Sequence, residues 1–191
     1  MNFYLHHKQS QQNQMKTRLT LRQRWNKFVK YIELPFKYIR NYILVKKYPF
    51  LRPQAGWSVS MNYHRPGYKY HYEETWLDTV PTGWKKLALE LCSKLKLIIE
   101  EDHITDYVIH QTKEKWGELN WYYEGGNDRI RKVTSEYEQK SRNICIRCGK
   151  SPTKYTTRGW VTYICEDCMR KYYSDKPDKV RLKKDLEGIW I

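Results

Sequence analysis

Two Cys-x-x-Cys pairs in the C-terminal third of the chain have the type and spacing of metal ligands. Cys145 and Cys148 form the first pair, Cys165 and Cys168 form the second, and sixteen residues lie between the pairs. Two residues between ligands allow one tight turn to direct both sulfurs at the same ion, and the second pair completes a tetrahedron. Because four thiolates leave no coordination position open for a substrate, the spacing predicts one structural Zn2+ ion and no catalysis at the metal.

A disulfide frame and a redox site are the alternative uses of these cysteines. Residues 1–14 are polar and lack the apolar stretch of a signal peptide, so we expect a cytosolic protein, in which stable disulfides are rare. A redox pair needs no second pair at this distance. The fifth cysteine, Cys92, lies beside an apolar helical stripe, and we expect a small buried side chain there.

Three local elements are needed to position the four sulfurs. Gly149 directly follows the second thiolate, at a position that often requires a positive φ. Arg158 and Gly159 can turn a hairpin whose return strand covers residues 160–164, and residues 169–173 fit a helix that carries the last two ligands near its start. This order predicts a zinc module over residues 141–175, of either treble-clef-like or ribbon-like type.

The residues before this module have the pattern of a small α+β domain over residues 49–140. Apolar side chains at helical spacing from Trp84 to Ile98 predict a helix over residues 81–100, and residues 127–142 return to that spacing. Residues 106–115 and 118–125 have strand composition, with Trp116 and Gly117 at the turn of a β-hairpin. The prolines and glycine of residues 48–56 indicate a linker, and the aromatic-rich residues 57–76 indicate irregular structure.

The N-terminal sequence predicts a basic amphipathic helical arm over residues 16–48. A disordered tail over residues 1–15 precedes it, and a second tail covers residues 176–191. Pro35 predicts a kink, or a break into two helices at Leu34. The apolar face of the arm could pack on the chain's own core, belong to a nucleic-acid-binding arm or lie on a membrane surface. That face consists of the residues at positions 21, 25, 28, 32, 36, 39 and 43.

The chain carries 36 basic and 21 acidic side chains, and the excess lies at its two ends. Residues 1–60 have a net charge of +11, residues 61–140 of −2 and residues 141–191 of +6. Such ends favour nucleic acid or a ribonucleoprotein as partner, with anionic lipid and simple solubility as the alternatives. No run of the sequence approaches the roughly 18 apolar residues of a transmembrane span. The predicted nucleic-acid contacts are Arg22, Arg24, Lys27, Lys30, Lys37, Arg40, Lys154, Arg158, Trp160 and Arg170.

Several elements between residues 48 and 170 form a specific combination. They are YPFLRP at 48–53, TVPTGWKKL at 79–87, KEKWGELNWYYEG at 113–125, and Ser141 followed by CIRCG, GW and CEDC. In this combination the chain resembles a family of bacteriophage and prophage proteins. The resemblance implies a phage origin, expression in the cytoplasm of a bacterial host and a zinc-stabilised C-terminal module, but no particular activity. At residues 118–120 the family tends to have Gly and Arg, whereas this chain has Glu-Leu-Asn.

These observations favour an α+β protein with a basic N-terminal helical arm, a small helix plus β-hairpin core and a C-terminal zinc module. Its predicted function is that of a non-enzymatic phage accessory protein that binds nucleic acid or a nucleic-acid-containing host machine. The alternative is a protein-interaction factor that modulates a host enzyme or defence system through the aromatic residues of 57–76 and 116–123. A third hypothesis is a metal-dependent nuclease that would use either Asp106 with Gln111 and Lys113, or Glu114 and Glu118 on the two sides of the turn. Surface carboxylates on a hairpin are the commoner explanation.

Overall fold

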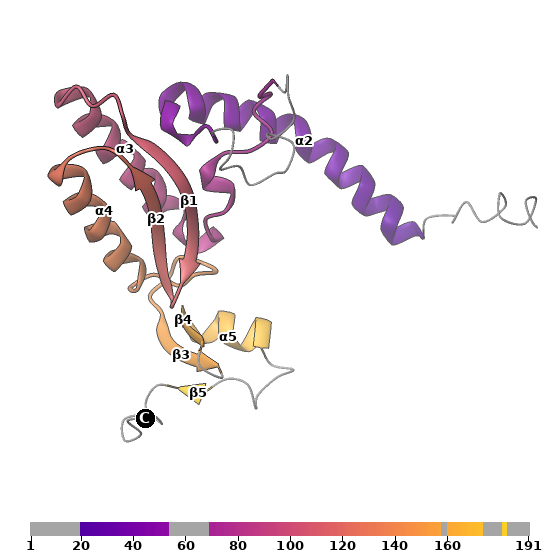
Figure 1. The fold of residues 1–191 in the computed structure, drawn as a ribbon. Helices are drawn as coiled ribbons and strands as arrows, with labels where there is room; N and C mark the ends of the chain where they lie inside the picture. Colours follow the sequence, from indigo (N-terminus) through magenta and orange to yellow (C-terminus); the bar gives the residue numbers. More distant parts are fainter. Residues whose placement is uncertain (1–19, 54–68, 158–159, 174–180, 183–191) are drawn as a thin grey trace, which may run out of the picture. The chain divides into compact units, whose positions relative to one another are not determined.

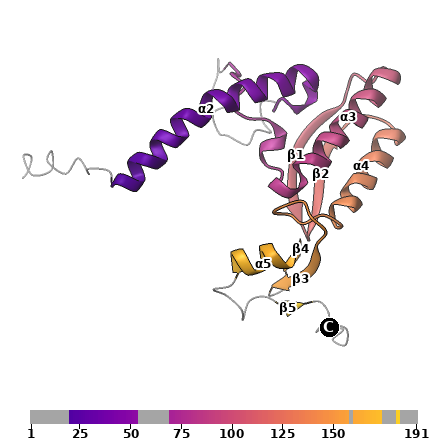
Figure 2. The same ribbon diagram turned by 180° about the vertical axis from the view of Figure 1, so that it is seen from behind.

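The computed structural model describes residues 20–53, 69–157, 160–173 and 181–182, with the backbone alone at 27–32, 153–157, 160 and 181–182. These residues form helices and antiparallel sheets, which confirms the predicted α+β class (Figure 1, and from behind in Figure 2). The chain divides into two compact units, Met1–Lys37 and Tyr38–Ile191. Within the described ranges, no helix combines the length and the apolar character that a membrane crossing needs.

Helix α2 spans Leu21–Lys47 as one continuous element. Thr20 and Gln23 form a capping box at the start of this helix. Gln23 N–H donates to Thr20 Oγ1 (3.2 Å), and Thr20 N–H donates to Gln23 Oε1 (2.8 Å). Pro35 lies inside the helix, so the predicted alternative of a break at Leu34 is wrong. A proline removes one backbone hydrogen bond, and the bonds of the turns on both sides keep the helix continuous.

Within the second unit, the last turns of α2 pack through a polar side chain. Asn41 is fully buried, and its Nδ2 group donates to the Tyr72 carbonyl oxygen (2.9 Å). Its Oδ1 atom accepts from the Arg40 guanidinium (2.9 Å), which also forms an ion pair with Asp78 (2.5 Å). The donor and acceptor of the buried amide are therefore both satisfied, as burial of a polar group requires.

The opposite face of these turns carries the predicted apolar stripe. Ile39 is 59% exposed and Ile43 is 57% exposed. Because successive helical residues are about 100° apart, these two side chains lie on the other side of the helix from Asn41. The hypothesis that the stripe packs on the chain's own core is therefore wrong for Ile39 and Ile43.

The segment after α2 belongs to the hydrophobic core. Tyr48 is buried, and its hydroxyl group forms a 2.7 Å hydrogen bond with Ser93 Oγ. A 3-10 helix, η1 (Pro49–Leu51), follows directly and buries Leu51 completely. The prolines of this segment therefore fix a tight turn within the core, and the predicted linker is wrong for residues 48–53.

Helix α3 (Lys85–Glu101) lies at the centre of the core, which confirms the predicted helix. Two short 3-10 helices lead into it, η3 (Trp76–Asp78) and η4 (Thr82–Trp84). Cys92 is fully buried as predicted, and burial raises the pKa of its thiol, so this cysteine is a packing residue. The buried side chains of α3 are Leu87, Ala88, Leu91, Cys92, Leu95 and Ile98.

Strands β1 (Val108–Lys115) and β2 (Glu118–Glu124) form the predicted antiparallel hairpin. Trp116 and Gly117 connect them with φ values of 56° and 79°. Two consecutive positive φ values are typical of the primed turns that match the twist of a hairpin. The hydrophobic side chains of the two strands that are buried in the core are Ile109, Leu119 and Trp121.

Helix α4 (Asp128–Ser141) lies beside α3 and along the free edge of β2 (Figure 1). Trp121 N–H donates to Glu138 Oε1 (2.7 Å), and Leu119 N–H donates to the hydroxyl group of Ser141 (2.8 Å). These two backbone groups point away from β1 and would lack partners in an uncovered strand. The helix therefore satisfies the edge of the sheet with its side chains.

The C-terminal elements are β3 (Thr153–Thr157), β4 (Trp160–Ile164), α5 (Glu166–Tyr173) and β5 (Arg181–Leu182). Strand β3 pairs antiparallel with both β4 and β5. The predicted return strand at 160–164 and the helix over residues 169–173 are confirmed, whereas the turn residues Arg158 and Gly159 lie outside the described residues. Strand β5 falls within the segment predicted as a tail.

Candidate metal centre

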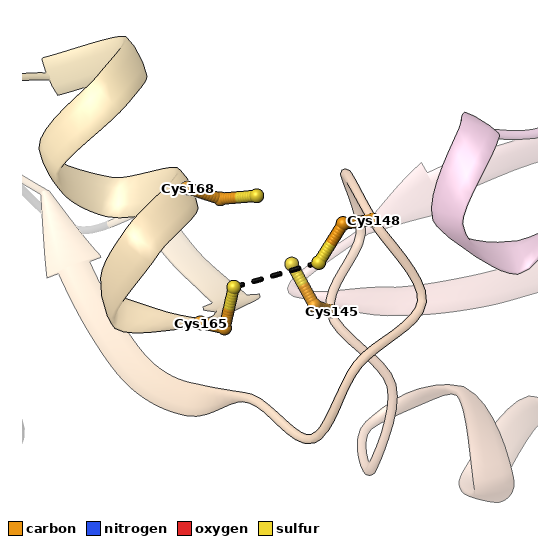
Figure 3. Close-up of side chains that lie close together, drawn as sticks. All are labelled: Cys145, Cys148, Cys165 and Cys168. Carbon is orange, nitrogen blue, oxygen red and sulfur yellow. Dashed lines mark hydrogen bonds between the residues drawn. The ribbon is translucent and has the colours of Figure 1, made fainter.

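The four cysteines approach one another from two sides of the C-terminal elements (Figure 3). Cys145 and Cys148 lie in the turn between α4 and β3, whereas Cys165 directly follows β4 and Cys168 lies in the first turn of α5. All four Sγ atoms lie within 4.8 Å of one another, and those of Cys148 and Cys165 are 3.5 Å apart. Sulfur ligands around a tetrahedral ion with bonds of about 2.3 Å are about 3.8 Å apart. The four cysteines can therefore hold one metal ion.

The turn that carries the first pair is closed by backbone hydrogen bonds. Gly149 N–H donates to the Cys145 carbonyl oxygen (2.9 Å), and Cys145 N–H donates to the Lys150 carbonyl oxygen (2.7 Å). Gly149 has a φ of 81°, which confirms the conformation predicted from its place after the second thiol. Any other residue would be strained there because of its Cβ atom.

The thiols of this cluster do not ionise alike. Burial acts to raise the pKa of Cys145, but backbone N–H groups of Cys148, Cys165 and Arg147 outweigh it and lower this pKa to about 7. Burial and hydrogen bonds with the neighbouring thiols raise the pKa of Cys168 to about 12. Close sulfur anions repel one another, so the thiols lose their last protons easily only when a cation joins them. The chemistry of the set is that of a metal site.

Gly83 and Trp84 hold the metal-ligand turn against the α+β core. Gly83 N–H donates to the Ile146 carbonyl oxygen (3.0 Å), and the indole Nε1–H of Trp84 donates to the Ile144 carbonyl oxygen (2.9 Å). A Cβ atom on Gly83 would lie 2.9 Å from Gly149 N, so only a glycine allows the two backbones to meet this closely. These residues are the GW of the TVPTGWKKL element, whose role the sequence alone did not indicate.

The tip of the β1–β2 hairpin makes a second contact with the C-terminal elements. A Cβ atom on Gly117 would lie 2.8 Å from the ring of Tyr163 and 3.2 Å from the side chain of Val161, both in β4. Tyr163 in turn accepts a backbone hydrogen bond from Ile146 N–H (2.9 Å). The ligand turn is therefore fixed from two directions, by η4 and by β4.

An exposed aromatic side chain with two cations close to its ring lies on α5. Tyr172 is 50% exposed, and its ring centroid is 5.0 Å from the Arg147 guanidinium and 5.5 Å from Lys171 Nζ. Arg147 lies between the first two ligands, so the metal-ligand turn itself supplies one of the cations. We refer to Arg147, Lys171 and Tyr172 as the α5 surface cluster. Sequence reasoning had missed Arg147, although a residue between two ligands of a tight turn is a candidate for exposure.

The predicted nucleic-acid contacts lie on different elements. Arg22 and Arg24 are exposed on α2 and Lys37 is half-buried there, whereas Arg40 pairs with Asp78. Arg170 is exposed on α5, where it pairs with Glu166 at 3.2 Å. The side chains of Lys27, Lys30, Lys154, Arg158 and Trp160 lie outside the described part of the structure.

The carboxylates considered for a nuclease have structural partners. Glu114 Oε1 accepts from Gly117 N–H (2.7 Å), and Asp106 Oδ1 accepts from Gly126 N–H (3.2 Å). Glu118 forms an ion pair with Arg142 at 2.5 Å. In the part of the chain that the structure describes, none of them belongs to a group of ligands close enough to hold a metal ion.

Comparisons of this chain with protein-family models, with curated proteins and with solved structures find no match.

Proposed function

We propose that the four cysteines bind one structural Zn2+ ion in a treble-clef-like module. Support comes from the order of the elements, since a tight turn supplies the first two ligands, a hairpin follows, and the start of a helix supplies the last two. In a ribbon-like module, by contrast, both pairs lie in turns between strands. Four thiolates are the ligand set of structural zinc, and they leave no position for a substrate.

The function that this site supports best is binding of single-stranded nucleic acid by a non-enzymatic protein. The observation that carries the proposal is the half-exposed ring of Tyr172 with Arg147 and Lys171 close to it. A base can stack on such a ring, and the two cations can contact the phosphates on either side of that base. The resemblance to phage proteins supports action in the cytoplasm of a bacterial host, on nucleic acid or on a nucleic-acid-containing host machine.

A salt titration with matched variants tests this proposal. Fluorescence anisotropy of a labelled oligonucleotide gives the affinity of the zinc-loaded protein between about 50 and 300 mM salt. We expect Arg147→Ala/Lys171→Ala to reduce the slope of log K against log salt by about 1.4, or 0.7 per lost single-strand contact. The control Lys86→Ala/Lys132→Ala removes the same charge from exposed positions on α3 and α4 and should leave the slope unchanged. An affinity insensitive to salt, or equal effects of the two variants, refutes the proposal.

A second candidate function, binding of a host protein, is favoured by the tip of the hairpin. Trp116 is 61% exposed although it occupies a turn, where polar residues are the usual choice. Tyr122 is partly exposed on β2, and Lys113 Nζ lies 4.9 Å from its ring centroid. Exposed Trp and Tyr side chains are frequent anchors of protein interfaces.

Copurification with nuclease treatment separates the two functions. A host protein that stays bound after nuclease digestion, and is lost with Trp116→Ser, supports the protein-interaction factor. A partner that nuclease releases, and that survives Trp116→Ser, supports nucleic-acid binding.

A further inference from the structure

A cavity of about 480 Å³ lies between the end of α2, the segment that follows it and the C-terminal half of α3. Small-molecule sites have volumes of about 300–1,000 Å³, so this cavity has room for a ligand of modest size. All of its lining residues belong to the second unit, Tyr38–Ile191. We refer to this cavity as the α2–α3 pocket, and the residues that define it are Lys46, Lys47, Phe50, Lys96, Ile99 and Ile104.

The apolar lining of the α2–α3 pocket is held in place by the hydrophobic core. Phe50, Ile99 and Ile104 are half-buried and pack against the core cluster. The ring of Phe50 meets the buried ring of Tyr107 edge to face, with the two centroids 5.6 Å apart. Since core contacts fix these side chains, a hydrocarbon group that enters the pocket meets a preformed apolar surface and leaves water with it.

Three ammonium groups line the same pocket. Lys46 and Lys47 come from the last turn of α2, and Lys96 comes from α3. The carboxylate of Glu100 is also in the lining, and its Oε1 atom lies 3.4 Å from Lys96 Nζ. Three positive charges and one negative charge give the described lining a net charge of +2. A cleft lined mainly by one sign of charge concentrates ligands of the opposite sign, so the pocket favours an anion.

The neutral polar groups of the pocket limit what the rest of the ligand can be. Of the described side chains that line it, Thr105 and Tyr107 carry a hydroxyl group. The hydroxyl oxygen of Tyr107 already accepts a hydrogen bond from the indole N–H of Trp121 (2.9 Å). A nucleoside or a sugar would lose water from many polar groups here and regain few hydrogen bonds. The lining therefore favours an anionic group attached to a hydrocarbon body.

We propose that the α2–α3 pocket binds a small amphiphilic anion, namely a carboxylate on a hydrocarbon chain or ring. The hydrocarbon body lies against Phe50, Ile99 and Ile104, and the carboxylate contacts the ammonium groups of the pocket. Contacts of this kind between ammonium and carboxylate groups are charge-assisted. The α5 surface cluster shares no residue with this pocket, so the activity is additional to the proposed binding of nucleic acid.

NMR titrations of the full-length, zinc-loaded protein test this proposal. Octanoate carries the anion on a chain and 2-naphthoate carries it on a ring, so the two probes distinguish the two kinds of body. We expect at least one of them to shift the methyl signals of Ile99 and Ile104 with one site per chain. Octanol lacks the charge and acetate lacks the chain, and each should bind at least about tenfold more weakly than octanoate.

Two variants with opposite effects assign the binding to the pocket. Lys47→Gln/Lys96→Gln removes two of the three ammonium groups and should weaken binding of the carboxylate probe at least about tenfold. Glu100→Gln removes the carboxylate that repels the ligand and competes for Lys96, so binding should become about two- to fivefold tighter. A gain in affinity cannot result from damage to the fold.

A matched control removes the same charge from α3 outside the pocket. Lys86→Gln/Lys94→Gln changes two exposed positions of this helix and should bind the probe as the unmodified protein does. Equal loss in the control overturns the proposal, as does octanol that binds as tightly as octanoate. It is also overturned if neither carboxylate shifts the methyl signals. Substitutions in the α5 surface cluster should leave these titrations unchanged, so the failure of nucleic-acid binding would not affect them.

Discussion

The contact between Gly83 and the metal-ligand turn makes a sharp prediction for Gly83→Ala. Gly83 does not have a positive φ, so backbone entropy alone would make alanine stabilising by roughly 0.4–1 kcal/mol. The new methyl group, however, would lie 2.7 Å from the carbonyl carbon of Ile146 and 2.9 Å from Gly149 N, where ordinary contacts begin at 3.4 Å. Both neighbours are backbone atoms, which cannot rotate away. Overpacking of this kind costs about 1–3 kcal/mol.

Separation of the two backbones would also break the hydrogen bonds between them. Gly83 N–H and the Trp84 indole N–H would lose their acceptors, and each buried donor left without a partner costs about 1–3 kcal/mol. We therefore expect Gly83→Ala to lower the free energy of unfolding by about 3–5 kcal/mol. The ligand turn would be displaced as well, so zinc affinity should fall at least tenfold.

Two measurements on zinc-loaded protein check this prediction. Urea unfolding followed by circular dichroism gives the stability, and competition with a chromophoric chelator gives the zinc affinity. Thr82→Ala is the control, since Thr82 is the exposed neighbour of Gly83 in η4 and should change neither quantity appreciably. A Gly83→Ala protein that is as stable as the unmodified chain and binds zinc equally well would show that the contact does not hold the turn.

Three further predictions have defined outcomes. Replacement of Cys148, the exposed ligand, by serine should lower the zinc content of the dialysed protein, measured by elemental analysis, from one ion per chain to none, whereas Cys92→Ala should retain the ion. Burial raises the pKa of Glu138 above its usual 4.5, so the stability that its protonated form contributes is lost as pH rises from about 4.5 through the folded-state pKa. At pH 7 the free energy of unfolding of Glu138→Gln should therefore exceed that of the unmodified protein, by less than about 1 kcal/mol because the group is part-exposed. Near pH 4 the two proteins should unfold at the same urea concentration. Asn41→Leu leaves the Tyr72 carbonyl group without its donor, while Arg40 keeps Asp78, and should cost about 1–3 kcal/mol in the same urea experiment.

Each of these has an outcome that contradicts its reasoning. Retention of stoichiometric zinc by Cys148→Ser would show that three sulfurs suffice. A stability gain of Glu138→Gln that does not change between pH 4 and pH 7 would have another cause than the buried carboxylate. A fully stable Asn41→Leu would show that α2 does not depend on this amide for its attachment.

The features that the sequence predicted well are those that short segments determine. The spacing of Cys145 and Cys148 requires a tight turn, and Gly149 supplies its positive φ. Trp116 and Gly117 likewise stand between two segments of strand composition, where a two-residue turn is the simplest connection. In both cases, the information lies within about ten residues.

The features that the sequence did not reveal depend on distant or polar contacts. Helical periodicity located the apolar face of α2 but could not show what covers it, and the face that packs is held by a buried Asn41. A polar residue in such a place gives no hydrophobic signal. The contact of Gly83 with Gly149 joins residues 66 positions apart, and neither residue has a side chain that could indicate it.

In the junction between η4 and the ligand turn, the turn contributes main-chain carbonyl oxygens, which accept from Gly83 N–H and the Trp84 indole N–H. The exposed side chain of Arg147 is not among these hydrogen-bond partners. Substitutions in the α5 surface cluster should therefore change the geometry of the thiols little. A designer could exchange the cations and the ring of α5 for other chemistries and keep the same metal-bearing frame beneath them.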